Sequence, residues 1–248
     1  EGVSGATTVG NTSTASITFS GTTYNANAQT YKAAAGNNFK MTNGATTTFT
    51  STDDAISFQT ADILLSGGSN LVVNSAGGAI SALQINGTTS EDVTLNASGG
   101  STNTVVVGAI GTGAGKINTV ALTGSGSVRL NGNITTDGNT GNSVTVTGPA
   151  LIGGAVTVDT TANAGDTTGA VSFTSTVNDV AANTNSLTIK SGGATAGITG
   201  VVGGSAKLTA LDINGTAGAG AITLGGIGGG AEGVSGATTV GNTSTASI

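Results

Sequence analysis

Any chemistry in this chain would depend on carboxylates, because the 248 residues contain 12 Asp and Glu, 6 Lys and Arg, no His and no Cys. The acids include two adjacent pairs, Asp53-Asp54 and Glu91-Asp92. Polysaccharide-cutting enzymes cleave glycosidic bonds with clustered carboxylates. Adjacent residues of a strand, however, point to opposite faces. The chain has a single arginine, Arg129, and no acid recurs at a spacing that would align it on neighbouring coils. We therefore expect no catalytic residues and interpret both pairs as solvated turns.

Calcium is the metal ion that we consider for these acids. Asp53 and Asp54 follow Ser51-Thr52, and Glu91 and Asp92 follow Thr88-Thr89-Ser90, so both pairs offer oxygen ligands in loop-like sequence. Neither the EF-hand spacing nor the glycine-rich calcium-roll motif is present. The sequence thus leaves open calcium binding by Asp53, Asp54, Glu91 and Asp92, and it predicts no other cofactor.

The residue types that are missing exclude several other classes of site. Zinc sites, cysteine nucleophiles and Ser-His-Asp triads all need His or Cys. The net charge of −6 disfavours nucleic acid and anionic membranes as partners. No stretch approaches the roughly 20 apolar residues of a membrane helix, so we expect no membrane span in this segment.

Short strands are expected to hold any functional side chains of this chain in position. Triplets that read apolar, polar, apolar recur along the whole chain, and this period of two is typical of a strand with one buried face. Nine such triplets lie at 17–19, 56–58, 93–95, 128–130, 144–146, 156–158, 171–173, 187–189 and 222–224. No segment has the sustained period of 3.6 that would indicate a helix.

Glycine and asparagine separate the strands. Gly is 44 of the 248 residues, and both residue types tolerate the positive φ angles of sharp corners. Corners are predicted at Gly67-Gly68, Asn86-Gly87, Gly99-Gly100, Asn131-Gly132, Gly192-Gly193 and Asn214-Gly215.

Many short strands without helices leave a sandwich, a barrel or a solenoid. The chain has no Trp and few aromatic residues, which disfavours an immunoglobulin-like sandwich and a transmembrane barrel. We therefore predict an all-β, right-handed parallel β-solenoid whose coils contain roughly 20–30 residues, with small aliphatic columns inside and Thr, Ser and Asn outside.

An exact repeat defines the domain organisation. The first seventeen residues, EGVSGATTVGNTSTASI, recur unchanged at 232–248. We interpret 1–231 as one solenoid unit of a tandem array and 232–248 as the start of the next identical unit. Because an open solenoid end presents unpaired N–H and C=O groups, identical units are the expected partners, stacked head to tail and with lateral self-association as a further option.

Three stretches carry a resemblance to a known group: Asn185–Ile189, Ile198–Gly204 and Leu208–Gly215. They resemble the large bacterial β-strand-repeat surface proteins, which are similar to filamentous-haemagglutinin-type and autotransporter-passenger adhesins. The resemblance covers most of the chain in style rather than through one motif. It implies an extracellular, cell-surface or secreted β-solenoid of a Gram-negative-type bacterium, and it supplies no catalytic residues.

These patterns together favour a structural role, as a repeat of a bacterial fibre or stalk whose units stack by continuing their β-sheets. An adhesin that binds host, cell or glycan surfaces is the alternative. A polysaccharide-acting β-helix enzyme is the more distant one.

Overall fold

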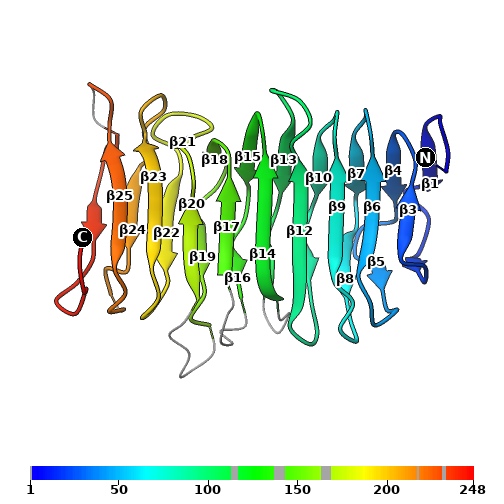
Figure 1. The fold of residues 1–248 in the computed structure, drawn as a ribbon, viewed down its shortest axis with the longest axis horizontal. Coiled ribbons are helices and arrows are strands. Elements are labelled where there is room, and N and C mark those ends of the chain that lie inside the picture. Colours follow the sequence, from blue (N-terminus) through cyan, green and yellow to red (C-terminus); the bar gives the residue numbers. More distant parts are fainter. Residues whose placement is uncertain (1, 113–116, 137–142, 163–168, 217, 231–232) are drawn as a thin grey trace.

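The chain winds into a parallel β-solenoid of about nine turns (Figure 1). The computed structural model describes residues 2–112, 117–136, 143–162, 169–216, 218–230 and 233–248. Within these ranges the regular elements are 26 strands, with no helix, and every strand pairing is parallel. Accordingly, the described residues contain no helix long and apolar enough to cross a membrane.

The strands form three faces, which the chain visits in the order first, second, third in each coil. The first face contains β3 (Thr23–Asn25), β6 (Thr47–Ser51), β9 (Leu71–Ser75), β12 (Glu91–Ala97), β14 (Ile117–Gly124), β17 (Ser143–Thr147), β20 (Ala170–Phe173) and the beginnings of β23 (Ala196–Val202) and β25 (Ile222–Ile227). The second face contains β1 (Thr7–Gly10), β4 (Gln29–Lys32), β7 (Ile56–Gln59), β10 (Ile80–Ala82), β13 (Thr104–Val107), β15 (Ser127–Leu130), β18 (Ala150–Ile152), β21 (Val177–Asp179) and the ends of β23 and β25.

The third face forms the remaining ladder. It contains β2 (Ile17–Phe19), β5 (Asn38–Met41), β8 (Asp62–Leu65), β11 (Ile85–Asn86), β16 (Ile134–Thr135), β19 (Val156–Asp159), β22 (Ser186–Lys190), β24 (Ala210–Ile213) and β26 (Thr238–Val240). A single bridging residue, Ile110, joins β11 to β16 across one coil. All nine triplets predicted as strands lie within these elements.

The register shows how much sequence one coil takes. Thr7 pairs with Gln29 on the following coil, and Gln29 pairs in turn with Ile56, so successive coils differ in length. The coils follow one another along the long axis of the molecule, from the N-terminal end to the C-terminal end (Figure 1). Both of these spacings confirm the coil length that the sequence predicted.

Inward side chains stack into apolar columns. Val105, Val128, Ala150 and Val177 are register partners on successive coils of the second face, and all four are fully buried. Burying a Val or Leu side chain stabilises a fold by about 1.5–3 kcal/mol. Because each column member touches its neighbours above and below, the interior stabilises coil-on-coil stacking.

Outward side chains link the coils through hydrogen bonds. Ser57 and Ser81 are register partners on β7 and β10, and their Oγ atoms lie 2.8 Å apart. Parallel stacking brings these two like residues into contact, as the sequence predicted for outward Ser positions.

Glycine is required at the corners for two different reasons. Gly67 and Gly68 have φ angles of 64° and 78°, which favour glycine. At Gly99 a Cβ would lie 1.5 Å from the carbonyl oxygen of Ala76 on the preceding coil, so close approach alone excludes a side chain. One predicted corner differs, because Asn86 ends β11 rather than forming a turn with Gly87.

Candidate stacking site

The acid pair Asp53-Asp54 lies in the turn between β6 and β7. Both side chains are exposed, and the backbone N–H of Asp54 donates to Ser51 Oγ at 3.0 Å. This turn follows the C-terminal end of a first-face strand, whereas Glu91 and Asp92 begin another first-face strand two coils away. The four acids proposed for calcium are therefore divided between the two ends of this face and do not form one cluster.

Glu91 is fully buried, so its interpretation as part of a solvated turn was wrong. Its carboxylate accepts hydrogen bonds from the backbone N–H groups of Thr88 at 2.7 Å and Thr89 at 2.8 Å, from Thr89 Oγ1 at 2.6 Å, and from the N–H of Gly68 at 3.3 Å. Burial alone raises the pKa of Glu91, but the hydrogen bonds from Thr89 and Thr88 outweigh it and hold that pKa below its usual value. The carboxylate thus ties a corner of one coil to the corner of the coil before it.

Asp92 points away from the core and joins three coils. Its backbone N–H donates to Asn70 Oδ1 at 2.8 Å, and its Oδ1 accepts from Asn118 Nδ2 at 2.9 Å and Thr119 Oγ1 at 2.6 Å. The described residues contain no group of three or more His, Cys, Asp or Glu that could hold a metal ion. Arg129 lies on β15, where its Nε donates to Asn131 Oδ1 at 2.8 Å. These hydrogen bonds of Asp92 and Arg129 therefore join each residue either to an adjacent coil or to another residue of its own coil.

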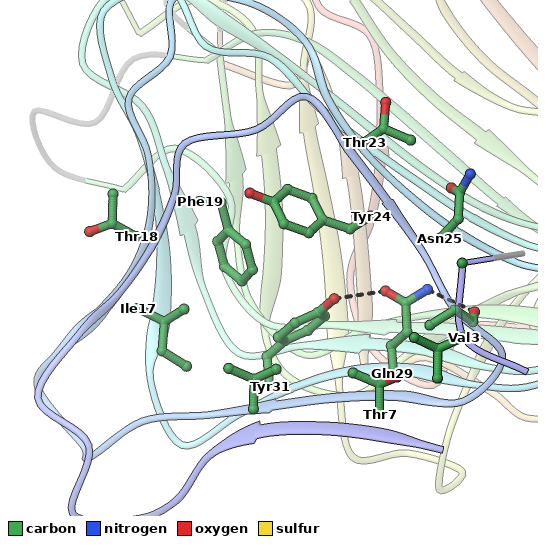
Figure 2. Close-up of a pocket in the computed structure, with 13 residues that line it drawn as sticks. Val3, Thr7, Ile17, Thr18, Phe19, Thr23, Tyr24, Asn25, Gln29 and Tyr31 are labelled. Carbon is green, nitrogen blue, oxygen red and sulfur yellow. Dashed lines mark hydrogen bonds between the residues drawn. The ribbon is translucent and has the colours of Figure 1, made fainter. Parts of the chain in front are cut away.

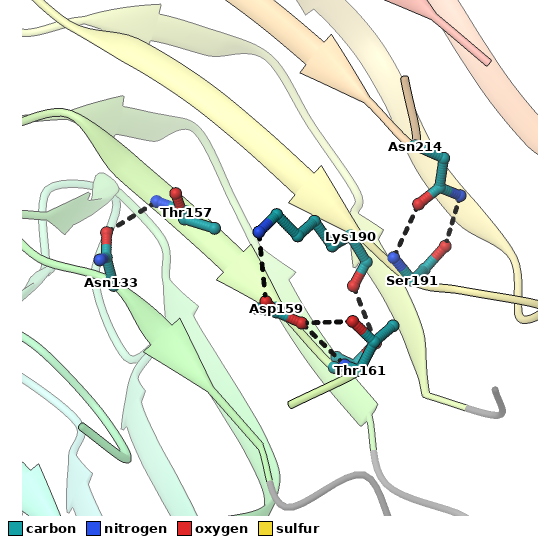
Figure 3. Close-up of polar contacts among 8 residues, drawn as sticks. Asn133, Thr157, Asp159, Thr161, Lys190, Ser191 and Asn214 are labelled. Carbon is teal, nitrogen blue, oxygen red and sulfur yellow. Dashed lines mark hydrogen bonds and ion pairs between the residues drawn. The ribbon is translucent and has the colours of Figure 1, made fainter. Parts of the chain in front are cut away.

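The third face carries further contacts of this kind toward its C-terminal end (Figure 3). Lys190 Nζ lies 3.6 Å from Asp159 Oδ2 on the adjacent coil, and Asp159 Oδ1 accepts from Thr161 N–H at 2.8 Å. Ser191 and Asn214 bond reciprocally: Ser191 N–H donates to Asn214 Oδ1 at 2.8 Å, and Asn214 Nδ2 donates to Ser191 Oγ at 2.9 Å. Asn214 has a φ of 52°, so this asparagine also forms the predicted corner.

The repeated sequence continues this third-face ladder. In its second occurrence, at 232–248, β26 pairs in parallel with β24, so that Leu211, Asp212 and Ile213 face Thr238, Thr239 and Val240. Backbone bonds run from Leu211 N–H to Ala237 O at 3.0 Å and from Gly241 N–H to Ile213 O at 2.8 Å. The second copy is therefore seated on the preceding coil by the same parallel pairing that joins interior coils.

The first occurrence, at 1–17, pairs with the coil that follows it, whereas the second pairs with the coil that precedes it. Here β1 pairs with β4 of the following coil, and Val3 bridges to Ala26. The edge of β1 that faces away from β4 has no strand partner among the described residues. The proposed boundary between units, at 231 and 232, lies outside the described residues.

A pocket of about 590 Å³ opens beside this edge (Figure 2). Its walls include Phe19, Tyr24 and Tyr31, together with Val3 and Val9, which are 47% and 39% exposed. The rings form one cluster: the Phe19 centroid lies 5.0 Å from those of Tyr24, Tyr31 and Phe49.

Tyr31 and Gln29 are two polar residues that line the pocket and bond to each other. The Tyr31 hydroxyl donates to Gln29 Oε1 at 2.8 Å, and Gln29 Nε2 donates to Ala26 O at 3.0 Å (Figure 2). Burial raises the pKa of Tyr31 above its usual value, with Tyr24 contributing, so the phenol is neutral and acts as a donor. The pocket is thus an apolar end surface of the solenoid interior, in which the Tyr31 and Gln29 side chains are already bonded to each other.

Sequence reasoning missed the burial of Glu91 and the position of this pocket. For Glu91, the three polar residues before it supplied the donors, and their position directly ahead of a strand was the available signal. No local signal marks the pocket, because its walls come from β1, β2, β3 and β4. Comparison of the chain with protein-family models, with curated proteins and with solved structures found no match.

Proposed function

We propose that this chain is a structural repeat of a secreted or cell-surface bacterial fibre or stalk. In this proposal residues 1–231 form one right-handed solenoid unit, and identical units stack head to tail by continuing their sheets. The repeat is a rod element, and it has no catalytic role.

One observation carries the proposal. The segment that would begin the next unit is paired with the last complete coil, through the β24–β26 ladder and the bridge from Leu208 to Val234. Because each coil of a solenoid contacts only its neighbours, pairing of this kind can extend a rod without a linker.

The interior and the surface agree with a rod-forming role. Apolar columns run through the described coils, and many outward polar side chains, such as Ser57 with Ser81 and Asp92 with Thr119, bond to the next coil. Placement outside the cell rests on the resemblance to bacterial surface proteins, together with the absence of cysteine.

Chains that contain one, two, three and six copies of residues 1–231, each ending in 232–248, test the proposal. Electron microscopy and small-angle scattering should show rigid rods that lengthen by about 45 Å per unit, because coils stack at roughly 4.8 Å. Rods of unchanged width are expected at every length.

Two other outcomes would contradict a purely structural role. Binding of a single unit to cells or to a glycan array would favour an adhesin. Polysaccharide cleavage that disappears in Asp53→Asn or Asp92→Asn would favour an enzyme.

A further inference from the structure

We infer that consecutive units join with a rotation of one third of a turn, so that the third face of one unit continues as the second face of the next. This inference rests on the proposed function, because it specifies how the stacked units meet. The interaction surface is the free edge of β1 with its apolar pocket, and the partner is the end of an identical unit.

The two copies of the repeated sequence lie on different faces. The first places Thr7–Gly10 on the second face and Ile17 on the third. The second places Thr238–Val240, the equivalent strand, on the third face. Its last residues reach the first face, where Ile222 N–H donates to Ser247 O at 2.8 Å. The same sequence has therefore advanced by one face over the length of one unit.

Both copies keep the same local conformation, so the shift is a change of position and not a refolding of the segment. In the first copy Asn11 Oδ1 accepts from Ser13 N–H at 2.8 Å, and Asn11 N–H donates to Thr14 Oγ1 at 3.0 Å. In the second copy the equivalent bonds around Asn242 measure 2.7 Å and 2.8 Å.

The glycine that precedes each of these turns is also equivalent. Gly10 and Gly241 have φ angles of 80° and 75°. At either position a Cβ would lie 3.0 Å from the Cδ1 atom of the isoleucine that ends the repeated sequence, Ile17 or Ile248. The segment is thus a preformed corner that fits two faces.

The backbone groups used by the two copies do not compete. The first copy bonds to the following coil through Val3 O, which accepts from Asn27 N–H at 3.0 Å, and Thr7 N–H, which donates to Ala28 O at 2.7 Å. The second copy bonds to the preceding coil through different positions of the same sequence. These are Gly233 O, Ser235 N–H, Ala237 O and Gly241 N–H, the equivalents of Gly2, Ser4, Ala6 and Gly10. One strand can therefore be paired on both edges at once, as the interior strands are.

The register across the junction follows from the bond between Ile222 and Ser247. In the parallel ladders a bond of this type runs from a residue to the position before its partner, as Ile56 N–H bonds Ala79 O while Ile56 pairs with Ile80. Ile222 is therefore beside Ile248, the equivalent of Ile17. Two residues further, Leu224 takes its place beside Phe19 of the next unit.

This register brings apolar surfaces together. Leu224 is only partly buried and Ile227, on the same strand, is 39% exposed, while Phe19 and Tyr24 line the open pocket of the next unit. All three faces continue across the junction. The third face of one unit leads to the second face of the next, the second face to the first, and the first face to the third. Three units then restore the original orientation, after about 135 Å at roughly 4.8 Å per coil.

Disulfide trapping distinguishes a rotated junction from an unrotated one, because the native chain has no cysteine. The test protein is a chain of two units. Thr223→Cys in the first unit is combined with Thr18→Cys in the second, or instead with Thr23→Cys in the second. All three threonines are exposed. Register partners on adjacent coils lie within the Cα separation of about 4.4–6.8 Å that a disulfide needs.

Rotation predicts that the Thr223–Thr18 pair oxidises and that the Thr223–Thr23 pair forms at least about tenfold less disulfide, because only the first pair meets that separation. Ser57→Cys with Ser81→Cys, within one unit, is the control for folding and for oxidation.

Preferential trapping of the Thr223–Thr23 pair would overturn the rotation and leave end-to-end stacking intact. Failure of both pairs, with the Ser57–Ser81 control oxidised, would overturn the rotation and the proposed stacking together. Images of unsubstituted six-unit rods give an independent reading, in which units that superpose without rotation contradict the inference.

Discussion

The two copies of EGVSGATTVGNTSTASI can be compared directly, because identical residues contact different neighbours in the same molecule. The first copy pairs with the coil that follows it and leaves Val3 and Val9 exposed. The second pairs with the coil that precedes it, and its Val234 and Val240 pack against the core. The local fold of the segment is the same in both. The difference shows that the sequence sets the shape of a corner, whereas stacking decides which residues are buried.

The largest difference between the copies is expected at a glycine. A Cβ at Gly233 would lie 2.3 Å from both Gly228 N and Val202 O, whereas at Gly2 its nearest contact would be Asn25 O at 2.9 Å. Gly233→Ala should destabilise the last coils by about 1–3 kcal/mol, as overpacking does, and Gly2→Ala by much less. Hydrogen exchange of the Leu208 amide, which donates to Gly233 O, measures the effect. Equal effects of the two substitutions would remove the contrast between the copies.

The asparagine of the corner gives the next largest difference. Asn242 Nδ2 donates to Asn214 O at 2.6 Å and to Gly218 O at 2.9 Å, in addition to the bonds that both copies share. Asn242→Ala should therefore cost about 2 kcal/mol more than Asn11→Ala, at roughly 1 kcal/mol for each of the two hydrogen bonds. Exchange of the Gly241 and Ala246 amides provides the measurement, with Thr243→Ala, at an exposed corner of the same turn, as the control. Equal losses for the two asparagines would show that the bonds to Asn214 and Gly218 contribute nothing.

A fall in pH should destabilise the middle of the solenoid more than either copy of the repeated sequence. The folded-state pKa of Glu91 is below its usual value, so its stabilising contribution is complete above the unfolded pKa and is lost as the pH falls through the folded pKa. Below pH 4.5 the Thr88–Glu91 corner should loosen first, because residues 2–17 and 233–248, the parts of the two copies that the structure describes, contain no side-chain carboxylate. The protection of the corner amides, which is their exchange rate corrected for the intrinsic pH dependence of amide exchange, should lose its dependence on pH in Glu91→Gln. A corner that loosens equally in the variant would assign the effect to another group.

A valine of the repeated strand gives the smallest difference. Val240 is partly buried and Val9 is 39% exposed, so Val240→Ala should cost under about 1 kcal/mol and Val9→Ala close to nothing. In a two-unit chain, Val9 of the second unit should contact a preceding coil, as Val240 does, in addition to its own following coil. Thermal unfolding of that chain should then respond to Val9→Ala in the second unit at least as strongly as the single unit responds to Val240→Ala. An unchanged response would mean that the junction leaves Val9 uncovered.

The sequence was a reliable guide wherever structure depends on neighbouring residues. Triplets such as Val144–Val146 alternate in polarity, and that alternation alone predicts a strand with one buried face. Gly67-Gly68 marked a corner because few other residues tolerate its φ angles.

Properties that depend on coil length could not be derived in the same way. Coils of unequal length shift the register by amounts that no local pattern encodes, so the face on which β26 lies was not predictable. The burial of Glu91 depends on Gly68, which donates to it from the preceding coil. Asn86 shows the opposite error, since its residue type suggested a corner but its pairing with Leu64 extends a strand.

The central claim is that one parallel stack of coils continues from unit to unit, and electron cryomicroscopy of a six-unit chain tests it most directly. The account predicts unbroken strand density at a spacing of about 4.8 Å through every boundary, with a constant three-sided cross-section. Density that divides into separate globules connected by thin, variably bent segments would contradict it.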